Sequence, residues 1–373
     1  MNINFYYDKI TETGPVPNGI LDYCIDEKYW PLPFGPATEA DGLTEVISSF
    51  YYSMIENNCQ ISLFTNENFS DHLFYPLEIG NGINVYIPPN TLNHLRTGKM
   101  KLLLLGQSFQ FYDQILHLKF LSNMFIKMNI APDNIIIITS DINNSYQELL
   151  YPCKSYGIDW WQIESRLILN KTTKKYNNFF KPINPLLQVH NFDIQTFNPN
   201  MLFHLYGEKS LPHRTKLIES LENSSLCDVG TITKSDNIKY HTNSLFTIIT
   251  PTSPVVNQTY MSEINALFTN LDIWQLLVMG KPFIIIGCQQ TIRYLNSLGY
   301  FTFYDLINEK YDSYLDIDVR IKLICSELTR IKDNDNTHIL NNTKKFAKLN
   351  KEKFLNRSHM PMFLNLFDKI RYG

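Results

Sequence analysis

Short runs of apolar residues recur along the first half of the chain, and stretches with helical periodicity separate them. The strand-like runs occupy residues 60–66, 83–88, 101–106 and 134–139. In residues 41–58 and 111–129 the apolar positions recur every three or four residues, which predicts helices with one apolar face. An alternation of buried strands and amphipathic helices is typical of a parallel α/β sheet.

The same alternation begins again in the second half of the chain. Strand-like runs occupy residues 201–207, 244–250 and 281–287, and helical stretches occupy residues 214–223, 262–279 and 317–332. The segment 341–371 has the periodicity of two further helices. The pattern predicts two α/β domains, each with a doubly wound parallel sheet, that face a cleft.

The region between the two halves has a weak pattern. Prolines at 182, 185 and 199 interrupt regular structure there. At 373 residues the chain has the length of two or three domains, and we place the boundary near residue 196. The predicted domains are 1–195 and 196–345, followed by a helical tail, 346–373, that can cross back onto the first domain.

The composition limits the partners and cofactors. Hydrophobic residues make up 44% of the chain, which indicates a folded protein. A net charge of −3 disfavours DNA as a partner, although it does not exclude a local basic patch that binds DNA. No apolar run reaches the ~18 residues of a membrane span, so we expect no membrane partner and a location in the cytoplasm or in a virion. The histidines form no HxH or HExxH pattern, and neither GxGxxG nor a P-loop occurs, so no metal or dinucleotide cofactor is expected.

Two Asp-x-Asp sequences imitate a metal-binding pair. Asp316 and Asp318 stand at the start of a predicted helix, whereas Asp333 and Asp335 lie in a polar loop. We interpret both pairs as solvated caps or loop residues rather than magnesium ligands.

The turn from Leu211 to Lys216 joins a predicted strand to a predicted helix. It contains His213, Arg214 and Lys216, and Pro212 suits the first turn of a helix. Because a helix N-terminus offers amide donors and a positive dipole end, the nearby basic side chains predict an anion site, most simply for phosphate. The alternative is an ordinary solvated basic first turn.

A long segment of the second half carries several short motifs. They are Gly280-Lys281-Pro282-Phe283, Leu298-Gly299-Tyr300-Phe301-Thr302-Phe303, Asn308-Glu309-Lys310-Tyr311-Asp312 and Arg320. Together with the His213-Arg214 turn they resemble a family of glycosyltransferase-like proteins of large phages and other DNA viruses. That resemblance implies a GT-B arrangement of two Rossmann-like domains, with a fucosyltransferase-like second domain that binds a nucleotide sugar without an obligatory metal. For Tyr311 and Asp312 we favour a turn that packs its aromatic ring.

The resemblance also implies acidic residues that bind the donor. Where the family has Thr-Glu-Lys before the helix, this chain has Asn270-Leu271-Asp272, and Ser262-Glu263-Ile264 lies further upstream. Glu263 and Asp272 are therefore the candidates to accept hydrogen bonds from the sugar or ribose hydroxyls. For Glu263 the alternative is an acidic residue favoured by the helix dipole.

An inverting transfer also needs a base near the acceptor hydroxyl. Glu39 and Asp41 lie in a turn-rich loop that enters a predicted helix of the first domain, although Asp41 is also a good N-cap. The expected function is transfer of a sugar from a nucleotide sugar to a glycan, a protein or a modified DNA base. The alternative is a catalytically reduced protein that serves as a virus-encoded binding or virion structural component.

Overall fold

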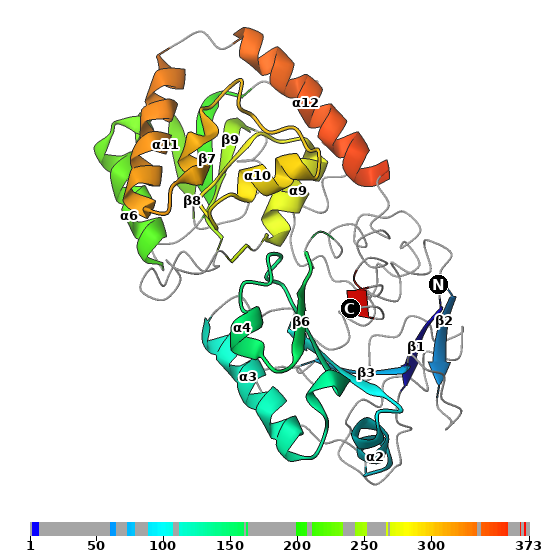
Figure 1. The fold of residues 1–373 in the computed structure, drawn as a ribbon. Coiled ribbons are helices and arrows are strands. Elements are labelled where there is room, and N and C mark those ends of the chain that lie inside the picture. The colour runs from blue at the N-terminus through cyan, green and yellow to red at the C-terminus, as the bar shows by residue number, and fades with distance from the viewer. Residues whose placement is uncertain are drawn as a thin grey trace. The chain divides into compact units, whose positions relative to one another are not determined.

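The computed structural model of the chain divides into two compact units (Figure 1). Unit 1 contains residues 1–163, 174–180 and 358–373, and unit 2 contains residues 164–173 and 181–357. The structure describes residues 2–6, 60–64, 73–78, 89–106, 112–159, 162, 199–206, 211–233, 243–251, 266–267, 269–333, 337–356, 366 and 369–370. The predicted helix at 41–58 and the predicted strand at 83–88 lie outside these residues.

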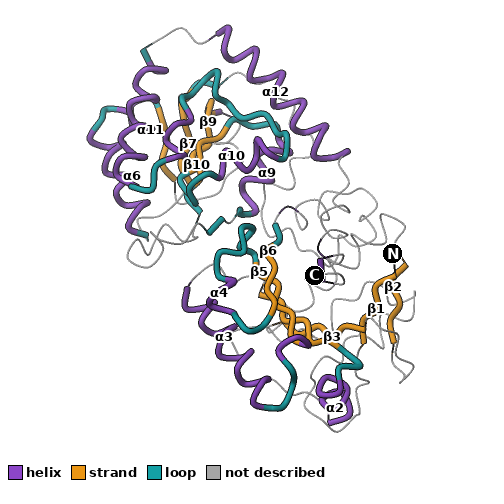
Figure 2. The backbone as a smooth tube through the Cα atoms, in the orientation of Figure 1, coloured by secondary structure: helices purple, strands orange, loops and turns teal. Residues whose placement is uncertain are grey.

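Unit 1 contains a six-stranded, fully parallel sheet in the order β2-β1-β3-β4-β5-β6 (Figure 2). Its strands are β1 (Asn2–Tyr6), β2 (Gln60–Phe64), β3 (Leu73–Glu78), β4 (Lys101–Gly106), β5 (Ile135–Thr139) and β6 (Lys154–Gly157). Its helices are α2 (Pro89–Thr97), α3 (Tyr112–Lys127), α4 (Gln147–Leu150) and the 3-10 turn η1 (Pro132–Asn134). The predictions of strands at 60–66, 101–106 and 134–139 and of a helix at 111–129 are confirmed.

The core of unit 1 lies around β4 and β5. Leu102, Leu103 and Leu104 of β4 are fully buried, and every residue of β5 is buried. Strands that are covered on both faces consist of continuous apolar runs, which is why these two strands could be recognised in the sequence. Strand β3 was not predicted, and it contains Pro76, a residue that is rare inside strands. Its pairing with β1 covers only Leu73 and Phe74, and Pro76 pairs with Leu103 of β4.

Unit 2 contains a four-stranded parallel sheet in the order β10-β9-β7-β8. Its strands are β7 (Met201–Tyr206), β8 (Gly230–Thr233), β9 (Ser244–Ile249) and β10 (Phe283–Ile285). Its helices are α6 (Pro212–Asn223), α9 (Leu271–Met279), α10 (Thr291–Ser297), α11 (Ile317–Lys332) and α12 (Thr337–Asn356), with 3-10 turns η5 (Leu226–Asp228) and η6 (Glu309–Ser313). Both units are therefore α/β with parallel sheets, consistent with Rossmann-like folds.

Helices cover both faces of this sheet (Figure 1). Helix α11 packs on α6, and α12 packs on α9. Trp274 of α9 is fully buried, and its ring meets Tyr300 edge-on at 5.6 Å and Phe354 of α12 at 5.7 Å. Aromatic pairs of this kind contribute ~0.5–1.5 kcal/mol each beyond their buried area, so they fix α12 on the sheet layer.

Most elements of unit 2 agree with the sequence, but β8 was not predicted and one predicted helix is wrong. The strands near 201–207, 244–250 and 281–287 and the helices at 214–223 and 317–332 are confirmed. The prediction of one helix over 262–279 is wrong, because α9 begins only at Leu271. Asn270 has an extended backbone and its side chain accepts from the amide of Ile273 at 3.2 Å, which makes it the N-cap.

The structure shows where α9 ends and whether the chain changes at residue 345, the predicted end of the second domain. Gly280 has a φ of 69°, the left-handed conformation that commonly closes a helix. Helix α12 runs without a break through residue 345, where the sequence pattern ended the second domain. Of the segment beyond it, Leu366 and Ile370 are buried within unit 1. Among the described residues, no helix combines the length and the apolar character needed to cross a bilayer.

Candidate functional site

The strand order of unit 2 contains a topological switch point between β7 and β9. From β7 the chain proceeds to β8 on one side, whereas β9 lies on the other side and is followed outward by β10. In open parallel sheets, ligands bind beyond the carboxyl ends of the strands at such a point. The segments that leave this edge are the start of α6 after β7, and Thr250 and Pro251 after β9.

Helix α6 presents its N-terminus to this edge. Pro212 occupies its first position, where the missing amide hydrogen costs nothing, and Leu211 precedes it in an extended conformation without a side-chain cap. The amides of a first helical turn have no intrahelical acceptors, so they form a positive end. His213 and Arg214 belong to this turn.

Arg214 connects α6 to the end of β9. Its Nε donates to the carbonyl oxygen of Thr250 at 3.0 Å, and its Nη2 donates to the same oxygen at 2.6 Å. The sequence predicted an anion contact for Arg214. The structure gives this edge of its guanidinium a backbone acceptor, so Arg214 fixes the two segments of the switch point relative to each other.

His213 is buried beside it, with 2% of its surface exposed. Burial, together with the charges of Arg214 and Arg320, lowers the pKa of the imidazole to about 4, while the Pro251 carbonyl opposes the shift. Neither ring nitrogen forms a hydrogen bond of ordinary geometry with any described residue. At neutral pH the site therefore contains a neutral imidazole, which has one N–H donor and one acceptor nitrogen.

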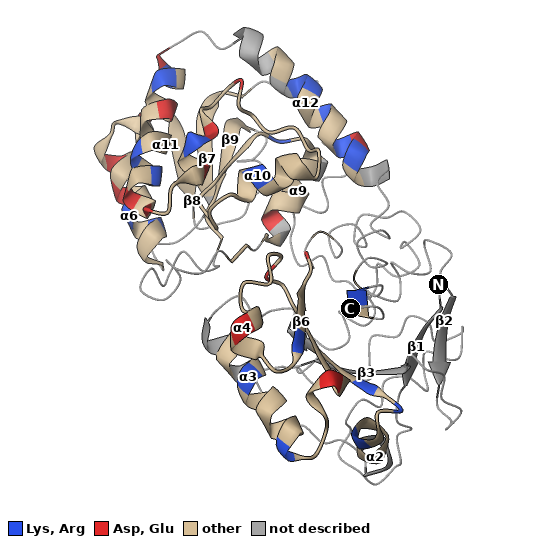
Figure 3. Ribbon diagram, viewed as in Figure 1, with Lys and Arg blue, Asp and Glu red and all other residues tan. Residues whose placement is uncertain are grey.

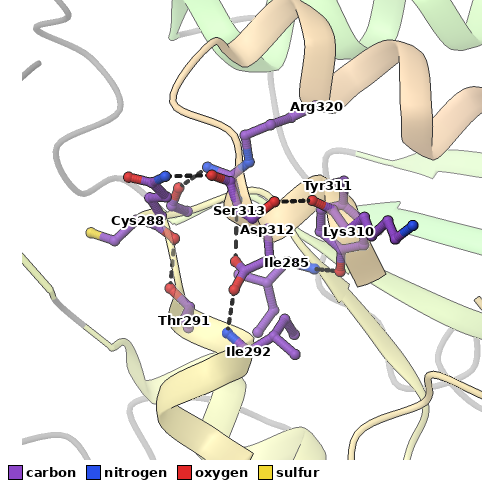
Figure 4. Close-up of polar contacts among 11 residues, drawn as sticks. Ile285, Cys288, Thr291, Ile292, Lys310, Tyr311, Asp312, Ser313 and Arg320 are labelled. Atoms are coloured by element: carbon purple, nitrogen blue, oxygen red, sulfur yellow. Dashed lines mark hydrogen bonds and ion pairs between the residues drawn. The ribbon is translucent and has the colours of Figure 1, made fainter. Parts of the chain in front are cut away.

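A buried ion pair lies at the same edge (Figure 4). Arg320, in the first turn of α11, donates from Nη1 to the carbonyl oxygen of Gly287 at 2.5 Å. Its Nη2 lies 3.6 Å from Oδ1 of Asp312, and both side chains are almost fully buried. Oδ2 of Asp312 accepts from the amide of Ile292, at the start of α10, at 2.9 Å.

The electrostatics of this pair follow from its burial. Burial raises the pKa of Asp312 to about 6, although Arg320 and the first amides of α10 favour its ionised form. Burial also lowers the pKa of Arg320, against the favourable charge of Asp312. Three polar atoms of the pair have no hydrogen-bonding partner in the part of the chain that the structure describes: Nε and Nη2 of Arg320 and Oδ1 of Asp312.

The turn before α11 supports this arrangement. Tyr311 is buried, and its hydroxyl oxygen accepts from the amide of Ile285 at 3.3 Å, which confirms the interpretation of a turn that packs its ring. Glu309 accepts from the Thr302 hydroxyl at 2.6 Å and from the amide of Phe303 at 2.8 Å. Burial raises the pKa of Glu309 to about 7, and these two hydrogen bonds oppose the shift.

The other predicted donor-binding residues have different surroundings. Lys216 is half-exposed and pairs with Asp318 of α11 at 2.8 Å. Asp272 lies in the first turn of α9, where Oδ2 accepts from the side-chain amide of Asn270 at 2.9 Å. Glu263 and the predicted bases Glu39 and Asp41 lie outside the described residues, so their roles stay predictions.

The Asp-x-Asp pair at the start of α11 is a helix cap. Oδ1 of Asp316 accepts from the amides of Asp318 at 2.8 Å and Val319 at 3.4 Å, so the predicted cap is confirmed. Asp333 ends α11, and residues 334–336 are outside the described part of the chain. Within that part, no three His, Cys, Asp or Glu residues are grouped so that they could hold a metal ion.

Two other basic features of unit 2 are separate from this edge. Lys281 precedes β10 and donates to the carbonyl oxygen of Ser244 at the start of β9, so it lies at the opposite edge of the sheet. Lysines also occur along α12 (Figure 3), where Lys348 is exposed and lies 3.9 Å from Glu352. Exposed pairs of this kind contribute at most ~1 kcal/mol and are screened by salt.

The sequence did not reveal the pairing of Asp312 with Arg320. Both residues belong to noted motifs, but local periodicity does not indicate which buried charges approach each other. A charged residue at an apolar position of α11 was the available signal, since Arg320 lies on the face that includes Ile317, Ile321 and Ile324.

A scan against models of known protein families finds no match to the chain, and no curated protein matches it.

Proposed function

We propose that the protein is a glycosyltransferase that binds the diphosphate of a nucleotide-sugar donor at the carboxyl edge of the unit 2 sheet. The observation that carries this proposal is His213, which is buried without a hydrogen-bonding partner among the described residues, beside Arg214 and Arg320 at a topological switch point. A GT-B arrangement, with unit 2 as the donor domain, is part of the proposal. The resemblance of the 280–320 motifs to virus-encoded glycosyltransferase-like proteins supports it.

The charge of the site suits a departing diphosphate. Two arginines and the N-terminus of α6 supply positive charge, and Asp312 neutralises only part of it. In glycosyl transfer the acceptor oxygen forms a bond to the anomeric carbon, the bond from that carbon to the phosphate oxygen breaks, and the diphosphate leaves with the electron pair. Fixed donors aimed at the developing negative charge lower the barrier to that step.

The remaining roles follow the sequence predictions. Glu263 or Asp272 accepts hydrogen bonds from sugar or ribose hydroxyls, and Glu39 or Asp41 takes the proton of the acceptor hydroxyl. The acceptor is a glycan, a protein or a modified DNA base. The donor is the substrate, and the proposed chemistry assigns no cofactor.

A second function is favoured by a different observation. Three candidate donor-binding residues already have intramolecular partners: Arg214 binds Thr250, Lys216 binds Asp318 and Asp272 binds Asn270. This arrangement suits a catalytically reduced member of the fold that binds a ligand, or assembles with other virus-encoded proteins, without turnover.

A panel of nucleotide sugars tests the first function. We expect one donor to raise the melting temperature of the full chain and to be hydrolysed slowly in the absence of an acceptor. His213→Leu, which retains bulk but has no ring nitrogens, should weaken donor binding about tenfold, equivalent to ~1.4 kcal/mol. Arg330→Ala, which removes a surface cation of α11 paired with Glu327 at 2.8 Å, should leave the affinity unchanged. Binding without turnover favours the second function, and the absence of any binding contradicts the first.

A further inference from the structure

We propose that the Nε and Nη2 edge of Arg320 is the principal phosphate ligand of this site, and that Arg214 is a positioning residue. This inference rests on the proposed function and deepens it, because it moves to Arg320 the phosphate contact that the sequence suggests for Arg214. It concerns atoms that are buried, positively charged and without hydrogen-bonding partners in the described chain.

The first argument is the hydrogen-bonding capacity of Arg320. Only 2% of this residue is exposed, and Nη1 has its acceptor in the Gly287 carbonyl. The N–H groups of Nε and Nη2 point in the same direction, which matches two oxygens of one phosphate group. Buried guanidinium donors are normally satisfied, so this edge lacks the bidentate acceptor for which its geometry is suited.

The second argument is that Asp312 does not act as the acceptor of the Nε and Nη2 donors of Arg320. Its Oδ1 lies 3.6 Å from Nη2, beyond hydrogen-bonding distance, and has no hydrogen-bonding partner among the described residues. The other oxygen is committed to the amide of Ile292 (Figure 4). Asp312 therefore offsets the charge of Arg320 without satisfying the donors on Nε and Nη2.

The third argument is the convergence of other donors on the same place. Arg214 and Arg320 both act on the ionisation of His213, so the three side chains lie within electrostatic reach of one another. The loop after β10 approaches the end of β9 closely, because a Cβ added to Gly287 would lie 3.1 Å from Pro251. An anion at Arg320 can therefore also accept a hydrogen bond from the neutral imidazole of His213.

The two arginines differ in how the equivalent edge is used. In Arg214, Nε and Nη2 both donate to the Thr250 carbonyl, so this edge holds the end of β9. In Arg320 the same two atoms lack an acceptor within the described residues. The difference assigns the phosphate to Arg320 and the alignment of the switch point to Arg214.

Titration of the full chain with inorganic pyrophosphate and with the nucleotide sugars tests this assignment. Arg320→Lys keeps the charge but loses the paired donors, and we expect its pyrophosphate affinity to fall about tenfold or more. Arg214→Lys can still donate to Thr250, so it should restore most of the affinity that Arg214→Ala loses. Arg330→Lys is the matched control, and its affinity should equal that of the wild type.

Asp312→Asn provides a second measurement that does not require the Arg320 variant to fold. Removing the nearby negative charge should tighten pyrophosphate binding, and pyrophosphate should raise the melting temperature more than it does in the wild type. Three results would overturn the assignment: equal pyrophosphate affinities of the wild type and Arg320→Lys, no pyrophosphate binding by the wild type, or no added effect in Asp312→Asn. In each case a bound water would be the partner of Nε and Nη2 of Arg320. Pyrophosphate binding that depends on Arg320, without binding of any nucleotide sugar, would refute the proposed function alone.

Discussion

The carboxyl edges of the two parallel sheets both carry buried ionisable residues, but the residues are used differently. In unit 1, Asp141 follows β5, and its two carboxylate oxygens accept from the amides of Asn143 at 3.2 Å and Ser145 at 2.5 Å. Asp159 follows β6 and accepts from the amide of Gln162 at 3.0 Å. These carboxylates are satisfied by their own loops and serve the local backbone.

In unit 2 the corresponding edge is only partly satisfied. His213 and the Nε and Nη2 atoms of Arg320 are as deeply buried, yet none has a hydrogen-bonding partner among the residues that the structure describes. The two sheets share their parallel architecture, so the architecture alone does not mark a site. In unit 1 too, Thr139 and Gln162 have buried polar side-chain atoms without hydrogen-bonding partners among the described residues, but these side chains carry no charge. The unit 2 edge differs because its unsatisfied atoms belong to Arg320 and His213 and lie at a topological switch point, and the following experiments test that distinction.

The largest effect on the free energy of unfolding is expected when Asp312 is removed from its buried pair with Arg320. Asp312→Leu leaves Arg320 buried and charged, and removal of one partner of such a pair typically costs ~3–5 kcal/mol. Arg320→Met should cost less at pH 6 or below, because the pKa of Asp312 is already raised to about 6 and the remaining carboxyl can take up a proton. Urea unfolding of both variants at pH 6 measures the difference, and equal losses would contradict this account.

The next effect is the pH dependence that Glu309 introduces. Its pKa is raised to about 7 from an ordinary value of 4.5, so the folded state favours the protonated form. The associated stability is fully present below about pH 4.5 and is lost as the pH rises through 7, which amounts to about 3 kcal/mol at ~1.4 kcal/mol per pKa unit.

Glu309→Gln should remove this dependence. The amide oxygen can still accept from Phe303, and the amide nitrogen can donate to the Thr302 hydroxyl oxygen. The hydroxyl hydrogen can then donate to Oδ1 of Asn296, 3.3 Å away, in place of Glu309. The quantity to measure is the difference in unfolding free energy between variant and wild type from pH 4.5 to 8. Only the difference is informative, because His213, with a pKa lowered to about 4, gains stability with rising pH in part of the same range. A constant difference would show that Glu309 does not titrate in this way.

A smaller effect is expected from Asp141, the hydrogen-bonded carboxylate at the edge of unit 1. Asp141→Ala removes the acceptor of two loop amides and should cost roughly 2 kcal/mol, since hydrogen bonds to charged groups contribute ~1.5–3 kcal/mol. Its pyrophosphate affinity should equal that of the wild type. A loss of pyrophosphate binding in this variant would show that the two edges are not functionally distinct.

The smallest effect concerns the exposed pair between α6 and α11. Lys216 and Asp318 are 47% and 53% exposed, and pairs of this kind are worth ~0–1 kcal/mol. Lys216→Ala should therefore change the unfolding free energy by less than 1 kcal/mol, and the change should shrink in 0.5 M salt. A larger or salt-independent loss would indicate a role for Lys216 beyond this contact.

The extent to which the fold follows from the sequence depends on how strongly each element is specified locally. Strands β4 and β5 are continuous apolar runs, and α11 has a cap at Asp316 and a regular apolar face. By contrast, the start of α9 depends on the side chain of Asn270, because apolar spacing continues upstream of the cap. Strand β3 depends on its neighbours, which accommodate Pro76 through pairing on one side.

The candidate site was predictable only in part for a related reason. The Pro212-His213-Arg214 turn is a local signal, and the sequence places it correctly between a strand and a helix. The acceptor of Arg214 is 36 residues away in Thr250, and the partner of the Arg320 Nη1 is 33 residues away in Gly287. Such distant pairings decide which arginine has available donors, and no local pattern contains that information.

The return of the chain to unit 1 has a consequence for the order of events during synthesis. Residues 358–373 belong to unit 1, and the Tyr156 hydroxyl donates to the Lys369 carbonyl across 213 positions at 3.3 Å. At ~5–20 residues per second, roughly 10–40 s pass on the ribosome between these two residues. Unit 1 must wait through that interval with Leu366 and Ile370 still absent, although the strands of its sheet are translated first. The unit whose strands are translated first is therefore complete only after residues 358–373 have been synthesised.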